Sequence, residues 1–380
     1  MSLEVADVIR VHGEAYRARF NPTARELAIM THIEQCRTAT LGGHADVCDD
    51  CGHALKISYN SCRDRHCPKC QGEKRRRWVE SRVARLLPVP HFHAVFTIPD
   101  KLNPVTLRNK KVVCNILFRA TAETLSTIAR DPKHFGAEIG FTAALHTWGQ
   151  NLAFHPHLHC VVTGGGLSLD GQRWLEARRE FLLPIGVLRD LFKKKFMAYL
   201  KEACRSGQIK GNFSFDACKS YLYGEKWHVF VKRSFGCAEA VMRYLGRYTH
   251  RVAISNSRLL SMEDGKVTFK WKDRRDGDRT KLMTLTASEF IRRFLLHVLP
   301  RGYTRIRHFG LFAPVNTNTK LEQCRALVAD TGAEDQPEVP DQERTQPEQE
   351  PVLETCPACG CKRIHRVPLE PGRILRWDTS

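Results

Sequence analysis

The stretch "HTWGQNLAFHPHLHCVV", residues 146–162, places four histidines on the two sides of one short connection. His157 and His159 flank Leu158, and side chains at alternate positions of a β-strand point to the same face. We therefore predict a strand that carries two imidazoles on one face. A hairpin turn centred between Asn151 and Leu152 would place His146 directly opposite His157.

Two imidazoles on a rigid strand can bind a divalent metal if a neighbouring segment supplies a third ligand. His146 is the natural third ligand, and Gln150 and His155 are the alternatives. A site with two or three protein ligands leaves coordination positions open, as catalysis requires. The tripeptide "HFH" at residues 91–93 has the same form but no upstream partner. Paired histidines in strands are usually structural, so neither pair is decisive alone.

The segment "VMRYLGRYTHR", residues 241–251, combines tyrosines with arginines. Tyr244 and Tyr248 are four residues apart, so both lie on one face of the predicted helix. The simpler interpretation is that they belong to an apolar core face. The alternative is chemical, because a tyrosyl oxygen can attack a phosphodiester and keep the DNA end covalently. Guanidinium groups would then position the DNA backbone, here those of Arg243, Arg247 and Arg251.

The cysteines cluster at metal-binding spacings. Two C-x2-C pairs can complete one tetrahedral zinc site, which here would consist of Cys48, Cys51, Cys67 and Cys70. Cys62 and His66 lie in the same block, and Cys36 and His44 precede it. These four residues could replace one of the ligands or build a second site. Near the end of the chain, a second small zinc knuckle is predicted from Cys356, Cys359, Cys361 and His365.

The chain is strongly basic, with 60 Lys and Arg against 41 Asp and Glu and a net charge of +19. This charge suggests a polyanionic partner, first of all nucleic acid. A predicted basic helix at residues 72–87 could contact phosphates and stack on a base, through Lys74, Arg75, Arg76, Arg77 and Trp78. The alternative is a solvated basic face with Trp78 as its core anchor.

Targeting features are not evident. The first 20 residues do not have the pattern of a signal peptide, and no apolar run reaches the length of about 18 residues that a membrane span needs. We therefore expect a cytoplasmic protein, associated with the nucleoid, and no membrane partner. Thiols stay reduced there, so the clustered cysteines favour metal ligation over disulfides.

Hydrophobic patterns predict an α+β fold in which helices cover one mixed or antiparallel sheet. Expected strands are 92–99, 137–148, 157–165 and 226–234, and expected helices are 23–38 (with Asn21 as its cap), 105–130 and 183–207. A hairpin of strands 251–259 and 267–273 is expected around Asp264-Gly265, and a strand-to-helix turn within 284–300. The expected parts are an N-terminal zinc-binding and basic domain (1–87), a main domain (88–320), a disordered acidic linker (321–354) and a Cys-rich tail (355–380).

Three motifs follow one another along the chain: "YNSCRDRHCPKCQ", then "HTWGQNLAFHPHLHCVVTGGGLS", then "YLGRYTHRVAISNSRL". Together they resemble the two-tyrosine HUH transposases of rolling-circle insertion sequences, the insertion sequence 91 family, from about residue 20 to residue 315. The resemblance implies a zinc-binding N-terminal domain and an HUH endonuclease domain with a small antiparallel sheet. His157 and His159 then correspond to the HUH pair, and Tyr244 and Tyr248 to the nucleophiles. "HFH" falls on the first strand, beside the metal strand, and the third ligand stays open between His146 and Gln150.

The resemblance also implies a reaction. One tyrosine would cleave single-stranded DNA at an element end, forming a 5′-phosphotyrosine and a free 3′-OH. The implied cofactors are catalytic Mg²⁺ or Mn²⁺ and structural Zn²⁺, and the implied partners are single-stranded element ends and target DNA. The alternatives are a plasmid replication initiator or relaxase, a non-catalytic zinc-dependent regulator that binds DNA, and a metal hydrolase. The oligomeric state is not determined by the sequence, and a homo-oligomer remains open.

Overall fold

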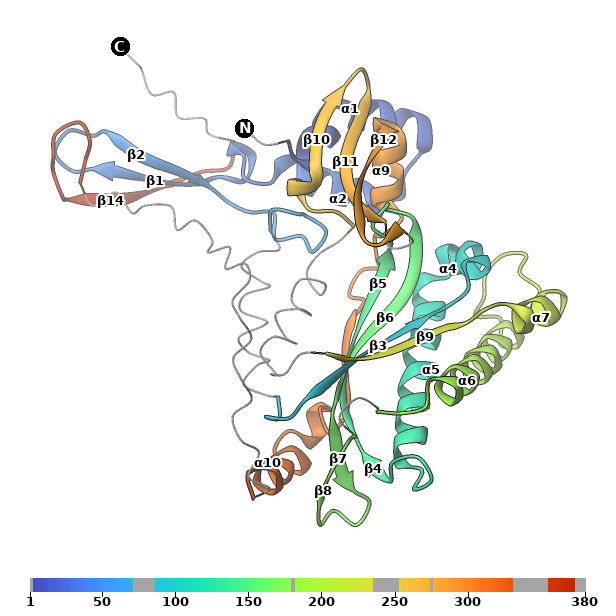
Figure 1. Ribbon diagram of the computed structural model, residues 1–380. Helices are drawn as coiled ribbons and strands as arrows, with labels where there is room; N and C mark the ends of the chain where they lie inside the picture. Colours follow the sequence, from blue (N-terminus) through green and yellow to red (C-terminus); the bar gives the residue numbers. More distant parts are fainter. Residues whose placement is uncertain are drawn as a thin grey trace. The chain divides into compact units, whose positions relative to one another are not determined.

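The computed structural model describes residues 3–70, 86–178, 182–234, 253–273, 276–330 and 355–372 (Figure 1). The chain divides into two compact units. The terminal unit contains Met1–Glu73, Ile254–Leu295 and Pro340–Ser380, and the central unit contains Lys74–Ala253 and Leu296–Val339. Among the described residues, no helix combines the length and the apolar character that a bilayer span requires.

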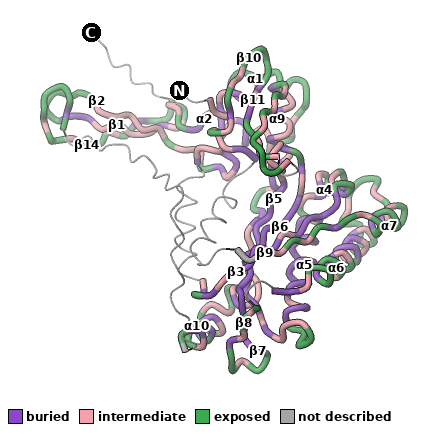
Figure 2. The backbone as a smooth tube through the Cα atoms, in the orientation of Figure 1, coloured by how far each residue is buried: buried purple, intermediate pink, exposed green. Residues whose placement is uncertain are grey.

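A five-stranded sheet forms the middle of the central unit. Its order is β13-β5-β6-β3-β9, and each neighbouring pair is antiparallel. The strands are β3 (His91–Thr97), β5 (Gly140–Trp148), β6 (Phe154–Thr163), β9 (His228–Ser234) and β13 (Ile306–Gly310). The predicted α+β class is thereby confirmed. Buried residues run almost without interruption along β5 and β6 (Figure 2).

Helices cover one face of this sheet (Figure 1). They are α5 (Lys110–Arg130), α6 (Ile185–Arg205) and the shorter α7 (Phe215–Gly224). Phe192 of α6 meets Phe96 of β3 edge-to-face at 5.1 Å between ring centroids. The even positions of β3 and β6 and the odd positions of β5 belong to this core. Their alternates, including every histidine of these three strands, therefore lie on the other face.

The predicted helix 105–130 is divided in two. Helix α4 (Asn103–Arg108) ends at Arg108, Asn109 follows as its C-cap, and α5 begins at Lys110. The Asn109 side chain accepts a hydrogen bond from the Lys210 backbone N–H at 2.8 Å and donates to the Lys210 carbonyl oxygen at 3.1 Å. Asparagine commonly bonds to backbone in this way, and here the bond fixes a non-helical residue between the two helices.

A smaller sheet, β4 (Ala137–Glu138), β7 (Gly165–Ser168) and β8 (Trp174–Glu176), extends the central unit. Helix α10 (Lys320–Asp330) belongs to the same region, because its Leu321, Cys324 and Val328 share a core with Leu167 and Trp174. The expected linker 321–354 therefore starts inside a helix. Residues 331–354 lie outside the described residues.

The terminal unit contains the helices α1 (Val5–Phe20), α2 (Ala24–Gln35) and α9 (Ala287–Leu295). Asn21, expected to cap the second helix, instead ends α1 in a left-handed conformation with φ 45°. The N-cap of α2 is Thr23, whose hydroxyl accepts from the Glu26 N–H while Glu26 accepts from the Thr23 N–H, a capping box. Helix α1 was not predicted.

Two three-stranded antiparallel sheets complete this unit. One consists of β10 (Leu259–Glu263), β11 (Lys266–Asp273) and β12 (Arg279–Thr286). Its first turn is the predicted Asp264-Gly265, with φ values of 48° and 69°, but the strand before it is 259–263 and not 251–259. Such paired positive φ values suit a tight hairpin.

Short 3-10 helices lie at Ala39–Leu41, Asp100–Leu102, Asn256–Arg258 and Pro314–Asn316.

The other sheet has the order β14-β1-β2 and joins the two ends of the chain (Figure 1). Its strands are β1 (Gly43–Cys48), β2 (Ala54–Tyr59) and β14 (Ile364–Leu369). All six residues of β1 pair with β14. Residues 364–369 of the expected tail 355–380 are therefore part of a sheet with the N-terminal segment. The compact units differ from the expected linear division because long-range pairing brings distant segments together.

Candidate functional site

The hairpin of β5 and β6 brings three histidines together. His146 pairs with His157, which is the register predicted from a turn centred between Asn151 and Leu152. His159 lies two residues further along the same face. One nitrogen from each ring lies within 4.8 Å of the others, and all three residues are buried. We call His146, His157 and His159 the histidine cluster.

Hydrogen bonds orient two of these rings. His157 Nδ1 lies 2.7 Å from the His155 carbonyl oxygen, which can only accept, so Nδ1 carries the proton. Its Nε2 is therefore a lone-pair donor, and it lies 3.1 Å from His159 Nε2. Two nitrogen atoms facing each other at this distance, with a third imidazole beside them, form a donor set that suits a divalent metal. Gln150, the alternative ligand, lies in the turn between the strands.

His93, which the sequence alone did not indicate as a site residue, contacts the histidine cluster. Strand β3 lies beside β6, as the resemblance implied, and His93 Nε2 is 2.7 Å from His159 Nδ1. The two rings are stacked with centroids 5.0 Å apart. If Nε2 of His159 is to bind a metal, its Nδ1 must carry the proton and donate it to His93. The alternation in "HFH" does indicate that His91 and His93 lie on one face of their strand. The contact between His93 and His159 becomes evident only from the pairing of β3 with β6.

Eight of the cysteines that the structure describes form two groups of four, and neither group is the predicted one. The first quartet is Cys36, Cys62, Cys67 and Cys70, and the second quartet is Cys48, Cys51, Cys356 and Cys359. The expected set took one pair from each quartet. Cys48 and Cys51 lie at the turn end of the β1–β2 hairpin, whereas Cys62 to Cys70 follow its open end. The six residues of β2 separate these ends by roughly 20 Å.

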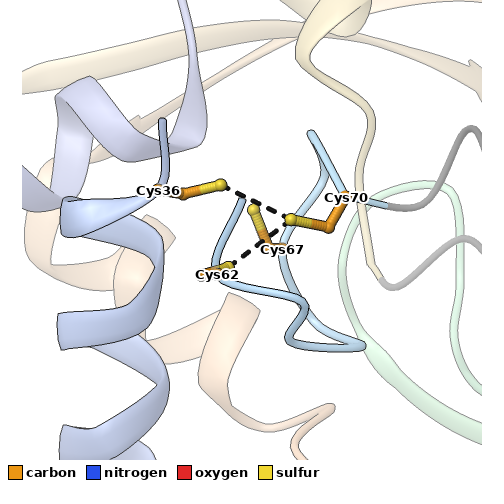
Figure 3. A group of neighbouring side chains, drawn as sticks. All are labelled: Cys36, Cys62, Cys67 and Cys70. Carbon is orange, nitrogen blue, oxygen red and sulfur yellow. Dashed lines mark hydrogen bonds between the residues drawn. The ribbon is translucent and has the colours of Figure 1, made fainter. Parts of the chain in front are cut away.

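The first quartet has the spacing of a metal site (Figure 3). Cys70 Sγ lies 3.4 Å from Cys36 Sγ and 3.5 Å from Cys62 Sγ. Zinc–sulfur bonds of about 2.3 Å place the sulfur atoms of a tetrahedron roughly 3.8 Å apart, whereas a disulfide needs about 2.05 Å. The cysteines therefore fit a zinc ion.

His66, a candidate ligand, has another role. Its Nδ1 lies 2.9 Å from Asp64 Oδ1, and His32 Nδ1 lies 3.0 Å from Asp64 Oδ2. Burial raises the pKa of Asp64, but the hydrogen bonds from His66 and His32 outweigh it and bring the pKa below its usual value. Asp64 and His66 thus fix the loop that carries Cys62 and Cys67.

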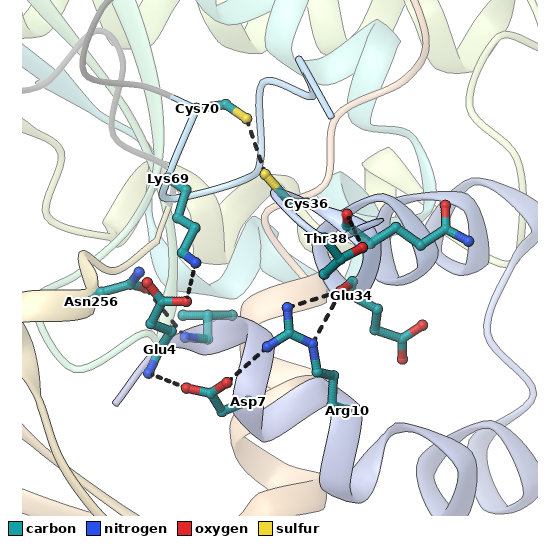
Figure 4. A network of polar contacts seen from close by, with 11 residues as sticks. Glu4, Asp7, Arg10, Glu34, Cys36, Thr38, Lys69, Cys70 and Asn256 are labelled. Carbon is teal, nitrogen blue, oxygen red and sulfur yellow. Dashed lines mark hydrogen bonds and ion pairs between the residues drawn. The ribbon is translucent and has the colours of Figure 1, made fainter. Parts of the chain in front are cut away.

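A chain of polar contacts supports the first quartet from the helical side (Figure 4). Lys69, between two of the cysteines, forms an ion pair of 2.6 Å with Glu4. The Glu4 backbone N–H donates to Asp7 at 2.9 Å, Asp7 pairs with Arg10 at 2.9 Å, and Arg10 donates to the Glu34 carbonyl oxygen near the end of α2. This series of contacts starts at Lys69, next to Cys70, and ends at Glu34, two residues before Cys36. It therefore connects the cysteine loop to the end of α2 without a metal.

The second quartet unites residues far apart in the sequence. Cys48 Sγ lies 3.5 Å from Cys359 Sγ, and Cys51 Sγ lies 3.7 Å from Cys356 Sγ. The predicted knuckle within the tail is therefore corrected. His365 Nδ1 instead lies 2.5 Å from the Asp49 carboxylate, and Cys361 Sγ accepts from the Arg363 N–H at 3.2 Å.

The remaining predicted site residues lie outside the described residues. They are the two tyrosines Tyr244 and Tyr248, the arginines Arg243, Arg247 and Arg251, and the basic-helix residues Lys74, Arg75, Arg76, Arg77 and Trp78. Their roles stay predictions from the sequence.

Comparisons with known proteins agree on one family. Residues 140–320 match the family model described as "Putative transposase", and residues 8–98 match the model described as "Transposase zinc-binding domain". The chain is 49% identical to "Putative transposase y4qJ" of Sinorhizobium fredii, over 99% of this chain and 98% of that protein. It is 30% identical to "Transposase for insertion sequence element IS801" of Pseudomonas savastanoi pv. phaseolicola, over 76% of this chain and 70% of that protein. No solved structure matches.

Proposed function

Because this chain belongs to the insertion sequence 91 family of transposases, we propose that it cleaves and rejoins single-stranded DNA at element ends in rolling-circle transposition. The observation that carries this proposal is the histidine cluster, three buried imidazoles that converge on one face of an antiparallel sheet. Three imidazole ligands leave other positions of a divalent ion open for phosphate oxygens.

In this proposal the metal would be held by His146, His157 and His159. When bound, it would supply Lewis-acid stabilisation of the charge that develops on the phosphate oxygens. Imidazole donors suit Mn²⁺ better than Mg²⁺, which prefers oxygen ligands, so we expect Mn²⁺ to support the higher activity of the two. The carbonyl of His155 and the ring of His93 orient the imidazoles of His157 and His159.

Tyr244 and Tyr248 are the proposed nucleophiles, on the strength of the sequence resemblance. The phenol loses its proton as its oxygen attacks phosphorus, the P–O3′ bond breaks, and the leaving 3′-oxygen gains a proton, so that protons balance. A 5′-phosphotyrosine and a free 3′-OH result. Attack of a 3′-OH on the phosphotyrosine reverses the process and restores tyrosine. The phosphotyrosine conserves the energy of the broken phosphodiester, so joining needs no ATP.

The cysteines of the first quartet would hold a structural zinc ion. All four lie within the segment that matches the transposase zinc-binding domain. Four thiolates fill a tetrahedral coordination sphere and leave no position for substrate, so this ion would stabilise the fold and take no part in strand cleavage.

The test is a cleavage assay on labelled single strands that carry the DNA flanking the gene. We expect wild-type protein with Mn²⁺ to form a covalent protein–DNA adduct. The double variant Tyr244→Phe/Tyr248→Phe and the double variant His157→Ala/His159→Ala should form none. Tyr221→Phe, which alters an exposed tyrosine of α7, and His134→Ala are the matched controls and should retain adduct formation.

Two outcomes contradict the proposal. An adduct that persists in the double tyrosine variant shows that the nucleophile lies elsewhere. Wild-type protein that binds these strands but forms no adduct on any end sequence favours the alternative of a non-catalytic zinc-dependent regulator.

A further inference from the structure

The two halves of the second quartet are built alike. Cys48-Gly52 and Cys356-Gly360 both have the sequence pattern C-x2-C-G. In each, the glycine N–H donates to the carbonyl of the first cysteine, at 3.0 Å and 2.8 Å. The two glycines are left-handed, with φ values of 71° and 72°.

The likeness extends one residue beyond each glycine. The N–H of Cys48 donates to the His53 carbonyl at 3.0 Å, and the N–H of Cys356 donates to the Cys361 carbonyl at 2.7 Å. Each segment is therefore a closed turn that directs two thiols to one side. Two such turns facing each other are the arrangement of a four-cysteine zinc ribbon.

The strands that carry these turns also belong together. Strand β14 pairs with β1 over six residues, and Arg366 of β14 forms an ion pair of 2.8 Å with Asp46 of β1. The Asp49 N–H donates to the Arg363 carbonyl at 3.1 Å. The buried apolar core of this sheet, among the described residues, is small and consists of Ala45, Val47 and Leu369, with Ile57, Tyr59 and Val367 partly buried against it. So small a core supplies little stability, and small modules of this kind usually depend on a metal.

We propose that Cys48, Cys51, Cys356 and Cys359 bind one zinc ion that fastens the C-terminal tail to the N-terminal hairpin. Four thiolates suit Zn²⁺, and the sulfur distances of 3.5 Å and 3.7 Å are close to a tetrahedral edge of roughly 3.8 Å. Only two of these cysteines lie in the segment that matches the zinc-binding domain. The ribbon is therefore split across the chain, and its assignment does not depend on the proposed strand cleavage.

Zinc content separates a shared site from two independent ones. The variant Cys356→Ser/Cys359→Ser should contain one zinc per chain less than the wild type, and Cys48→Ser/Cys51→Ser should show the same loss. Combining all four changes should remove no further zinc, because both pairs serve one ion. Cys361→Ser, in the same turn but outside the quartet, is the control and should keep the wild-type content. A tail variant with wild-type zinc, or a combined variant that loses two ions, overturns the proposal.

A second measurement uses the wild-type cysteines, so its result does not depend on whether the serine variants fold. A protease site inserted within residues 331–354 of the full chain allows the tail to be cut from the rest after purification. We expect the cut tail to stay bound during size-exclusion chromatography and to be released by a zinc chelator. Addition of Zn²⁺ should restore binding, and replacement by Co²⁺ should give thiolate-to-cobalt charge-transfer absorption. Release of the tail before chelation, or retention unaffected by chelation, contradicts a zinc clip.

Discussion

His93 is the residue through which β3 reaches the histidine cluster. Its Nε2 lies 2.7 Å from His159 Nδ1, while His159 Nε2 faces His157. A partner at Nδ1 fixes both the tautomer and the orientation of a metal-binding imidazole, and loss of such a partner typically costs 10–100-fold in metal affinity. His93 therefore acts through His159 and not on the substrate.

We predict that His93→Ala raises the Mn²⁺ concentration needed for half-maximal binding by about 10-fold or more. His93→Gln should restore much of the affinity, because its amide oxygen can still accept from His159 Nδ1. Mn²⁺ binding followed by electron paramagnetic resonance measures this without reference to DNA cleavage. Equal Mn²⁺ affinity in wild type, His93→Ala and His93→Gln would rule out the positioning role.

His91, on the same strand, is buried and stacks on Phe312. Burial lowers the pKa of His91 to about 4, and the nearby backbone of Val89 offsets this only in part. In the unfolded chain the pKa returns to about 6.5. Between these values the unfolded state binds a proton that the folded state does not, so stability falls as the pH falls from about 6.5 to about 4.

The variant His91→Phe should remove this contribution. Between pH 7.5 and pH 5 we expect the wild type to lose about 2 kcal/mol more unfolding free energy than the variant. Urea titrations at the two pH values measure the difference. His228→Phe, which replaces an exposed histidine of the same sheet, is the control and should follow the wild type. Parallel losses in wild type and His91→Phe would contradict the assignment.

At the scale of elements, the edge strand β13 ends in a position that only glycine can occupy. Gly310 has a φ of 58°, and a methyl group there would collide with the Ile139 carbonyl oxygen. That oxygen accepts from the Leu311 N–H at 3.2 Å, so it cannot easily move away. The close approach lets the chain leave the sheet and turn towards α10.

We predict that Gly310→Ala destabilises the protein by about 2–4 kcal/mol, because it combines left-handed strain with a backbone clash. Gly186→Ala is the matched control. Gly186 lies in the first turn of α6 with nothing near its missing side chain, so alanine there should be neutral or stabilise by about 0.4–1 kcal/mol. Chemical denaturation of both variants provides the test, and similar midpoints would contradict the account.

Local patterns predicted the β5–β6 hairpin correctly. Strand alternation has a period of two, and a short connection leaves little freedom in register, so the opposition of His146 and His157 followed from the residues alone. The cysteine grouping was wrong because C-x2-C pairs carry no information about which other pair they meet. Cys48 and Cys51 meet a pair more than 300 residues away, and only the pairing of β1 with β14 reveals it.

At the scale of the whole molecule, the formal net charge of +19 bears on how DNA is bound. We predict that single-strand affinity falls steeply with salt, with a log–log slope of roughly −0.7 for each neutralised phosphate. Fluorescence anisotropy of a labelled oligonucleotide across a salt series measures the slope. A flat response would show that charge neutralisation does not drive binding.

The split of the second quartet also has a consequence in time. Cys51 and Cys356 are 305 residues apart, so at about 5–20 residues per second a ribosome needs roughly 15–60 s between them. During that interval β1 can pair with β2 but lacks its other neighbour, β14, and Cys48 and Cys51 lack their partner cysteines. The terminal unit can be completed only after the central unit has been synthesised. A chain that stops early, by nonsense mutation or stalled translation, would carry only two of the four ribbon cysteines and an unpaired edge of β1. Cellular quality control recognises such incompletely folded chains and degrades them.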